Sequence, residues 1–193
     1  MTTEDVANKI KQMHLNKKPV IIAIDGFGGA GKSSLAKGLE KELQSATIVE
    51  VDDFYIFGKK SDADKSNFDR SRLVEQVLEP LKQGESASYQ KSIDKNNPLS
   101  GYFDVPQVTY LILEGVSSLH PDIAKYVDYK IWIDTSADEA KKRMMNRDKS
   151  LGQDHGEQLW SHWTDSYQAY KDLHHPESLA DLIVDWVQGH RVS

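Results

Sequence analysis

The chain has 193 residues, which suits a single domain over 1–193, and its 24 basic and 30 acidic side chains give a formal net charge of −6. This acidic balance, with no basic block, argues against nucleic-acid binding, which depends on Lys and Arg at phosphates. Cysteine is absent, and no apolar run is long enough to span a membrane or to form a secretion signal, so we expect a cytoplasmic protein without a disulfide or thiolate metal site.

A helix and a strand are predicted before the first glycine-rich segment. Val6, Ile10 and Met13 fall on one face of a helix near the start of the chain. The run Val20–Ile24 is short, apolar and rich in β-branched residues, which is typical of a buried parallel strand. The strand leads directly into the glycine-rich segment.

Residues 26–33 read GFGGAGKS, the GxxxxGKS pattern of a phosphate-binding loop. Leu35, Leu39 and Leu43 then mark a helix, so the pattern lies between a strand and a helix start, where backbone N–H groups and the helix dipole can bind phosphate. Lys32 is expected to reach the β- and γ-phosphates of ATP, and Ser33 to ligate Mg²⁺. An ordinary glycine-rich turn is the alternative. The residues predicted to bind the nucleotide are Gly26, Gly28, Gly29, Ala30, Gly31, Lys32, Ser33 and Ser34.

The remaining elements are predicted in the following order. A strand covers 47–51, a polar loop 58–66, an amphipathic helix 69–82, and a hairpin or substrate-side insert about 85–107. Strands follow at 109–113, 129–133 and 182–184, with helices at 137–147 and 157–173 between the last two. Trp160, Trp163, Tyr167 and Tyr170 recur at helical spacing and indicate a face packed on the core, with base stacking by one of them as the less favoured alternative.

Alternating strands and helices predict an α/β fold of the P-loop NTPase type, a parallel sheet with helices on both faces in three α/β/α layers. Carboxylates follow several strands, at Asp25, Asp52, Glu114 and Asp134. They would meet at the carboxyl edge of the sheet, where ligands bind in such folds, and Mg²⁺ or a general base would explain them. Capping of the next helix is the other explanation, which we favour for Asp134.

Four blocks of the sequence resemble the uridine kinase and phosphoribulokinase-like family of P-loop kinases. They are residues 26–34, the Asp-Asp-Phe-Tyr run 52–55, the Asn-Phe-Asp run 67–69, and the Leu-Ile-Leu-Glu-Gly run 111–115. The resemblance implies ATP-dependent phosphorylation of a small-molecule hydroxyl, and the leading candidate is a ribose hydroxyl of a nucleoside such as uridine or cytidine. It also implies a lid at about 137–158.

The resemblance assigns roles to individual residues. Asp52 matches the family's catalytic base, which lies near the metal, and Asp53 is an adjacent alternative. Phe54 and Tyr55 would line the acceptor pocket, and a place among the core aromatics is the less favoured alternative. Further matches are Asp69 for ribose hydroxyls, Tyr89 for the acceptor, Glu114 for the metal, and Arg143 and Arg147 for the lid, where a solvated helix face is the alternative.

The sequence departs from the family pattern at two places. Gly152-Gln153-Asp154 lacks an Arg that the family tends to have, which would remove one positive charge facing the phosphates. No His follows Tyr89, which leaves the acceptor open. Another nucleoside, a vitamin precursor or a sugar acid therefore remains an alternative acceptor, and a nucleotide-dependent switch is the rival from another class. The choice between ATP and GTP and a homo-oligomeric state also stay open, although no Asn-Lys-x-Asp guanine motif is present.

Overall fold

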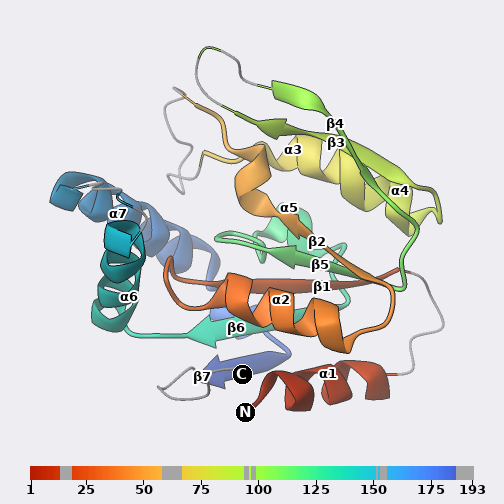
Figure 1. Ribbon diagram of the computed structural model, residues 1–193, viewed down its shortest axis with the longest axis horizontal. Helices are drawn as coiled ribbons and strands as arrows, with labels where there is room; N and C mark the ends of the chain where they lie inside the picture. The colour runs from red at the N-terminus through yellow and green to blue at the C-terminus, as the bar shows by residue number, and fades with distance from the viewer. Residues whose placement is uncertain are drawn as a thin grey trace.

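Five parallel strands form one sheet in the order β2-β5-β1-β6-β7 (Figure 1). The structure is a computed structural model, and it describes residues 1–13, 19–57, 67–93, 96, 99–150, 152 and 156–185, except the side chains of 156–159 and 162. Each neighbouring pair is parallel, with Ile22 of β1 opposite Ile112 of β5 and Tyr129 of β6. The strands are β1 (Val20–Gly26), β2 (Ala46–Glu50), β5 (Tyr110–Glu114), β6 (Tyr129–Asp134) and β7 (Leu182–Asp185). The predicted parallel sheet is confirmed.

Helices cover both faces of the sheet, because alternate side chains of β1 enter two separate cores. Ile22 and Ile24 pack with α1 (Thr3–Gln12) and α2 (Lys32–Glu42) on one face. Ile21 packs into the other core with the helical segment 70–82 and with α5 (Pro121–Ala124). Figure 1 shows these helices on opposite sides of the strands. The three-layer α/β/α architecture is therefore confirmed.

The helix predicted at 69–82 begins at Arg70 and contains a wider turn. It consists of α3 (Arg70–Leu73), a π-helical turn (Val74–Leu78) and α4 (Glu79–Lys82). Pro80 has no N–H to donate and its ring would clash with the carbonyl four residues earlier, so an unbroken α-helix is disfavoured there. The N–H of Glu79 instead donates to the carbonyl of Val74, five residues back.

An antiparallel hairpin lies inside the segment 85–107, where a hairpin or insert was predicted. It consists of β3 (Ala87–Ser92) and β4 (Leu99–Val105), and Tyr89 pairs with Phe103. Ala87, Tyr89 and Val105 are buried in the same core as the helical segment 70–82. The hairpin is therefore attached to the side of the molecule that carries α3 and α4.

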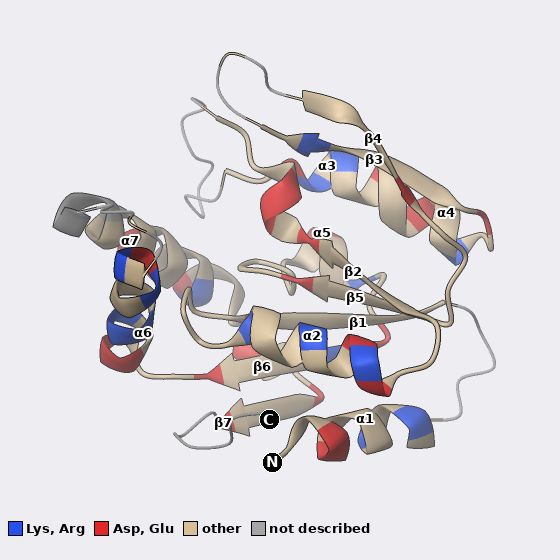
Figure 2. Cartoon of the chain, in the orientation of Figure 1, with Lys and Arg blue, Asp and Glu red and all other residues tan. Residues whose placement is uncertain are grey.

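Two long helices follow β6, namely α6 (Ala137–Ser150) and α7 (Gly156–His174). The side chain of Ser136 caps the start of α6, because its Oγ accepts the N–H of Glu139 at 3.3 Å. The prediction that Asp134 caps this helix is therefore wrong. Figure 2 shows charged residues of both signs along α6. Among the described residues, no helix combines the length and apolarity needed to cross a membrane. The predicted loop 58–66 lies outside the described residues.

Candidate active site at the carboxyl edge of the sheet

The loop between β1 and α2 is a backbone cradle suited to an anion. Gly29 and Gly31 have φ angles of 85° and 104°, a region that residues with a Cβ enter only at a cost. Gly31 is the N-cap of α2, and no side chain caps this 11-residue helix. The first N–H groups of α2 are thus suited to a bound anion, which the helix dipole also favours.

The same loop lies directly against α6. A Cβ built on Gly29 would lie 2.4 Å from the carbonyl oxygen of Ala140, and one on Gly28 would lie 3.5 Å from Sδ of Met144. Only glycine at position 29 allows the loop to lie this close to the carbonyl oxygen of Ala140. The glycine spacing predicts the loop's conformation, but its contact with α6 has no local signal in the sequence.

Lys32 lies under the loop with only 8% of its surface exposed. Its Nζ donates to the carbonyl oxygens of Gly26 and Phe27, both at 3.0 Å. Burial lowers the pKa of the Lys32 ammonium, and the charges of three carboxylates oppose this fall. The carboxylates that act on Lys32 are, in decreasing order of effect, Asp25, Glu114 and Asp52. Three of the carboxylates predicted at strand ends therefore lie near one ammonium group, that of Lys32.

Ser33 and Glu114 form a hydrogen-bonded pair of oxygen groups next to Lys32. The Ser33 hydroxyl donates to Oε1 of Glu114 at 2.9 Å, which joins the start of α2 to the end of β5. Burial raises the pKa of Glu114, while Lys32 and the Ser33 hydrogen bond oppose this rise. In the described parts of the chain, no group of three or more His or acidic side chains could bind a metal by itself. A magnesium ion bound through one or two carboxylates and substrate phosphates does not require such a group.

The structure distinguishes the neighbouring carboxylates Asp52 and Asp53. Both lie in a 3₁₀ turn (Val51–Phe54) directly after β2, where successive side chains point about 120° apart. Asp53 accepts the Tyr89 hydroxyl at 2.7 Å and the Lys91 ammonium at 3.0 Å, so it is bound to the hairpin. Asp52 reaches solvent. The surrounding protein still raises the pKa of Asp52 by desolvation, and the charge of Lys32 opposes this rise.

A close backbone approach brings the ends of β2 and β5 together. Gly115, directly after Glu114, has a φ of 147°, and a Cβ there would lie 2.7 Å from Cβ of Val51. Its N–H donates to the carbonyl of Ile24 in β1. Gly115 therefore lets the turn with Asp52 lie against the end of the strand that carries Glu114.

The predicted acceptor-side aromatics are found in different environments. Phe54 is fully buried in the core and stacks on Tyr89, with ring centroids 5.2 Å apart, so the core alternative describes it. Tyr89 is also buried, and its hydroxyl is bound to Asp53. Tyr55 is half-buried, packs edge-on against Phe68 at 5.9 Å and accepts the Asn67 amide at 3.3 Å.

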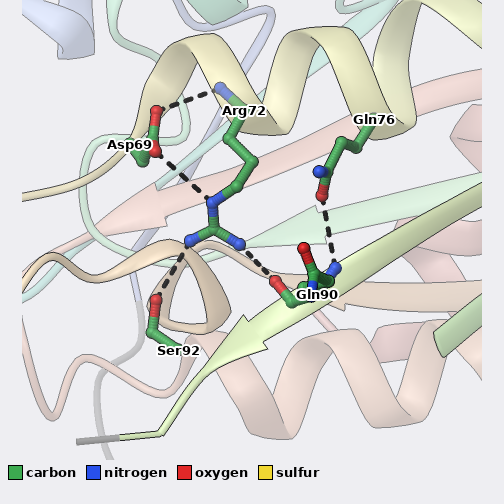
Figure 3. A network of polar contacts seen from close by, with 5 residues as sticks. All are labelled: Asp69, Arg72, Gln76, Gln90 and Ser92. Atoms are coloured by element: carbon green, nitrogen blue, oxygen red, sulfur yellow. Dashed lines mark hydrogen bonds and ion pairs between the residues drawn. The ribbon is translucent and has the colours of Figure 1, made fainter. Parts of the chain in front are cut away.

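Asp69, predicted to hold ribose hydroxyls, binds Arg72 (Figure 3). One oxygen of Asp69 caps α3 through the N–H of Arg72 at 3.1 Å, and the other accepts from the guanidinium at 3.4 Å. The guanidinium also donates to the carbonyl of Gln90 and, at 3.0 Å, to the hydroxyl of Ser92, and it lies 4.7 Å from the centre of the Phe54 ring. Sequence analysis missed this link between α3 and the hairpin. The signal available in the sequence was the spacing of three residues between Asp69 and Arg72, which brings two side chains together on one face of a helix.

The two predicted lid arginines in α6 differ in their surroundings. Nε of Arg143 donates to Glu139 at 2.9 Å, one helical turn away. Arg147 contacts the neighbouring Asp148, and its charge also acts on both Lys32 and Asp52. The charge of Arg147 therefore acts at the carboxyl edge of the sheet.

Comparisons with known proteins agree with this geometry. Residues 2–159 match the model of the KAP family P-loop domain. A curated uridine kinase from Clostridium perfringens strain 13 is 33% identical over 146 residues, which cover 68% of this chain and 69% of that protein.

Two solved structures share the fold at low sequence identity. A possible uridine kinase from Bacillus stearothermophilus aligns with a TM-score of 0.70 and 17% identity, over 95% of this chain and 97% of that one. A D-glycerate 3-kinase from Cryptococcus neoformans aligns with a TM-score of 0.61 and 15% identity, over 90% of this chain and 86% of that one. The fold thus occurs in a kinase whose named acceptor is not a nucleoside.

Replacing Gly115 with Ala tests the close approach of the two strand ends. We expect a loss of about 2 kcal/mol or more in the free energy of unfolding, since the new Cβ would meet Val51 and the backbone would be strained. The control is Gly84→Ala, which also has a positive φ (82°) but no atom within 4 Å of its Cβ, and should cost about 1 kcal/mol. Urea unfolding measures both. Equal losses would contradict the proposed role of Gly115.

Proposed function

The chain belongs to the KAP family of P-loop domains and to the uridine kinase-like family of P-loop kinases, and from that premise we propose that it transfers the γ-phosphoryl group of ATP to a hydroxyl of a small molecule. The proposal is carried by one observation: Lys32, the Ser33–Glu114 pair and Asp52 interact at a single edge of the sheet. Phosphoryl transfer requires a cation at the phosphates, oxygen ligands for a metal ion, and a carboxylate for the attacking hydroxyl.

The loop and the start of α2 would bind the triphosphate. Backbone N–H groups would bind its oxygens, and Lys32 would exchange its contacts with the loop carbonyls for the β- and γ-phosphates. Ser33 and Glu114, with Asp52 nearby, fit Mg²⁺, because several carboxylates around a single ammonium leave an excess of negative charge. Bound there, Mg²⁺ would neutralise charge on the transferring phosphoryl group.

Asp52 would orient the acceptor and accept its proton. As the acceptor oxygen forms its bond to the γ-phosphorus, the proton would pass to an Asp52 oxygen, and the bond from phosphorus to the β-phosphate oxygen would break to release ADP. Asp53 is less suited to this role because Tyr89 and Lys91 already bind it. Arg147 would add positive charge above the phosphates, as expected of a lid that excludes water.

The ribose of uridine or cytidine is the acceptor that the family supports best. A different acceptor, such as a vitamin precursor or a sugar acid, is the second candidate. It is favoured by the contacts of two residues expected to bind a nucleoside: Asp69 is paired with Arg72, and the Tyr89 hydroxyl is bound to Asp53. A nucleoside would have to displace at least one of these contacts or bind beside them.

An ADP-release screen with ATP and Mg²⁺ tests the function. The panel comprises nucleosides, alcohols from vitamin biosynthesis and sugar acids, each measured against an acceptor-free control. We expect the highest kcat/KM with uridine or cytidine. A sugar acid or vitamin precursor as the best substrate would replace the nucleoside as the acceptor. ATP binding without acceptor-stimulated ADP release across the panel would instead support a nucleotide-dependent switch.

Substitution of Asp52 and Asp53 tests which carboxylate is the base. Asp52→Ala should lower kcat by about 10²- to 10⁴-fold, the usual contribution of a general base, while the affinity for ATP changes little. The matched variant Asp53→Ala should release Tyr89 and Lys91 and act mainly on the KM for the acceptor. Steady-state kinetics and calorimetric ATP titration provide the data. Near wild-type kcat in Asp52→Ala would transfer the role to Asp53.

A further inference from the structure

Asp25 is a fully buried carboxylate that the proposed reaction does not use. It lies in β1, directly before Gly26 and the phosphate loop, and none of its surface is exposed. A substrate hydroxyl therefore has no access to it. A buried charge is costly unless hydrogen bonds satisfy it, so its contacts indicate its role.

Four groups donate hydrogen bonds to the Asp25 side chain. Oδ1 accepts the N–H of Gly26 at 2.7 Å and that of Ser117 at 3.2 Å. Oδ2 accepts the N–H of Leu119 at 2.9 Å and the hydroxyl of Tyr170 at 2.8 Å. An ionised carboxylate accepts about four hydrogen bonds and donates none, so these donors match the charged form.

The donors come from three parts of the site that are distant in sequence. Gly26 opens the phosphate loop, and Ser117 and Leu119 belong to the turn that follows Glu114. Ser117 has a φ of 69°, an unfavourable value for a residue with a side chain, and its N–H bond to Asp25 holds the turn in this form. Tyr170 belongs to α7.

The helix α7 also packs on the phosphate loop itself. The ring of Phe27, the second residue of the loop, lies 4.4 Å from that of Tyr167 and 5.4 Å from that of Trp160, measured between centroids. Tyr170 is one helical turn beyond Tyr167 and binds Asp25. Two kinds of contact therefore fix the phosphate loop: the aromatic contacts of Phe27 with α7, and the hydrogen bond from Gly26 to the Asp25 carboxylate.

We propose that Asp25 is a positioning residue of the nucleotide site, which holds the first peptide of the phosphate loop, the turn after Glu114 and helix α7 in one arrangement. This inference rests on the proposed function. It assigns to Asp25 no contact with substrate or metal. Its charge has a second effect: among the carboxylates around Lys32, Asp25 acts on the ammonium most strongly and favours the cationic form that binds phosphate.

Two variants and two matched controls test the role of Asp25. Asp25→Asn keeps the shape but places an amide N–H₂ against a donor, and Tyr170→Phe keeps the ring but removes the hydroxyl that binds Asp25. Asp128→Asn alters a carboxylate at the opposite end of β1, where it accepts the N–H of Ile21 at 3.0 Å. Tyr126→Phe removes an exposed hydroxyl bond to Glu79.

Calorimetry measures the affinity of each protein for a non-hydrolysable ATP analogue with Mg²⁺, without acceptor, at a temperature where circular dichroism shows it fully folded. We expect Asp25→Asn to bind about 10- to 100-fold more weakly, as when orienting partners of a metal site are lost, and Tyr170→Phe several-fold more weakly. Both controls should remain within about twofold of wild type. Hydrogen exchange should accelerate at 115–120 in Asp25→Asn while the interior of β1 stays protected.

Several outcomes would overturn the inference. These are wild-type affinity in folded Asp25→Asn, an equal loss in Asp128→Asn, or unchanged exchange at 115–120. If Asp25→Asn does not fold, the affinity of Tyr170→Phe decides, and a value equal to that of Tyr126→Phe would refute the role. Failure of the wild-type protein to bind the analogue would instead refute the proposed function, and this inference with it.

Discussion

A single buried ammonium surrounded by carboxylates governs the functional edge of the sheet. Desolvation by the surrounding protein lowers the pKa of Lys32 and raises the pKa values of Asp25, Glu114 and Asp52, so each group depends on the opposite charge nearby. The carboxylates outnumber the ammonium, and a polyphosphate would add further negative charge. The proposed function resolves this imbalance with loop N–H groups, the dipole of α2 and a dication.

The two halves of the candidate site are built in different ways. The phosphate side is largely made of backbone: positive φ angles at Gly29 and Gly31, and the close approach of Gly115 to Val51. The proposed acceptor side is made of side chains from the 3₁₀ turn after β2, the hairpin and α3, connected by Arg72 and by the Tyr89–Asp53 bond. Side chains can change without altering the sheet edge, which gives a physical reason why one fold can serve different acceptors.

The strand–loop–helix unit could be predicted because each part has its own local signal: the β-branched run of β1, the glycine spacing, and leucines at helical spacing in α2. Boundaries were less exact, since the strand predicted at 47–51 ends at Glu50 and Val51 begins a 3₁₀ turn. Contacts between distant segments have no such signal. The packing of Ala140 on Gly29 and the binding of Ser117 to Asp25 depend on how the chain returns to the sheet edge. Asp25 itself was recognised as a strand-end carboxylate, but its burial was not.

The dependence of nucleotide binding on magnesium tests the central claim most directly. Calorimetric titration of the protein with a non-hydrolysable ATP analogue, once with Mg²⁺ and once with a chelator in its place, measures whether the carboxylates around Lys32 need a dication to accept a polyphosphate. The charge balance at this edge predicts that removal of Mg²⁺ weakens binding by at least about tenfold, or about 1.4 kcal/mol. Equal affinity in both titrations would contradict it.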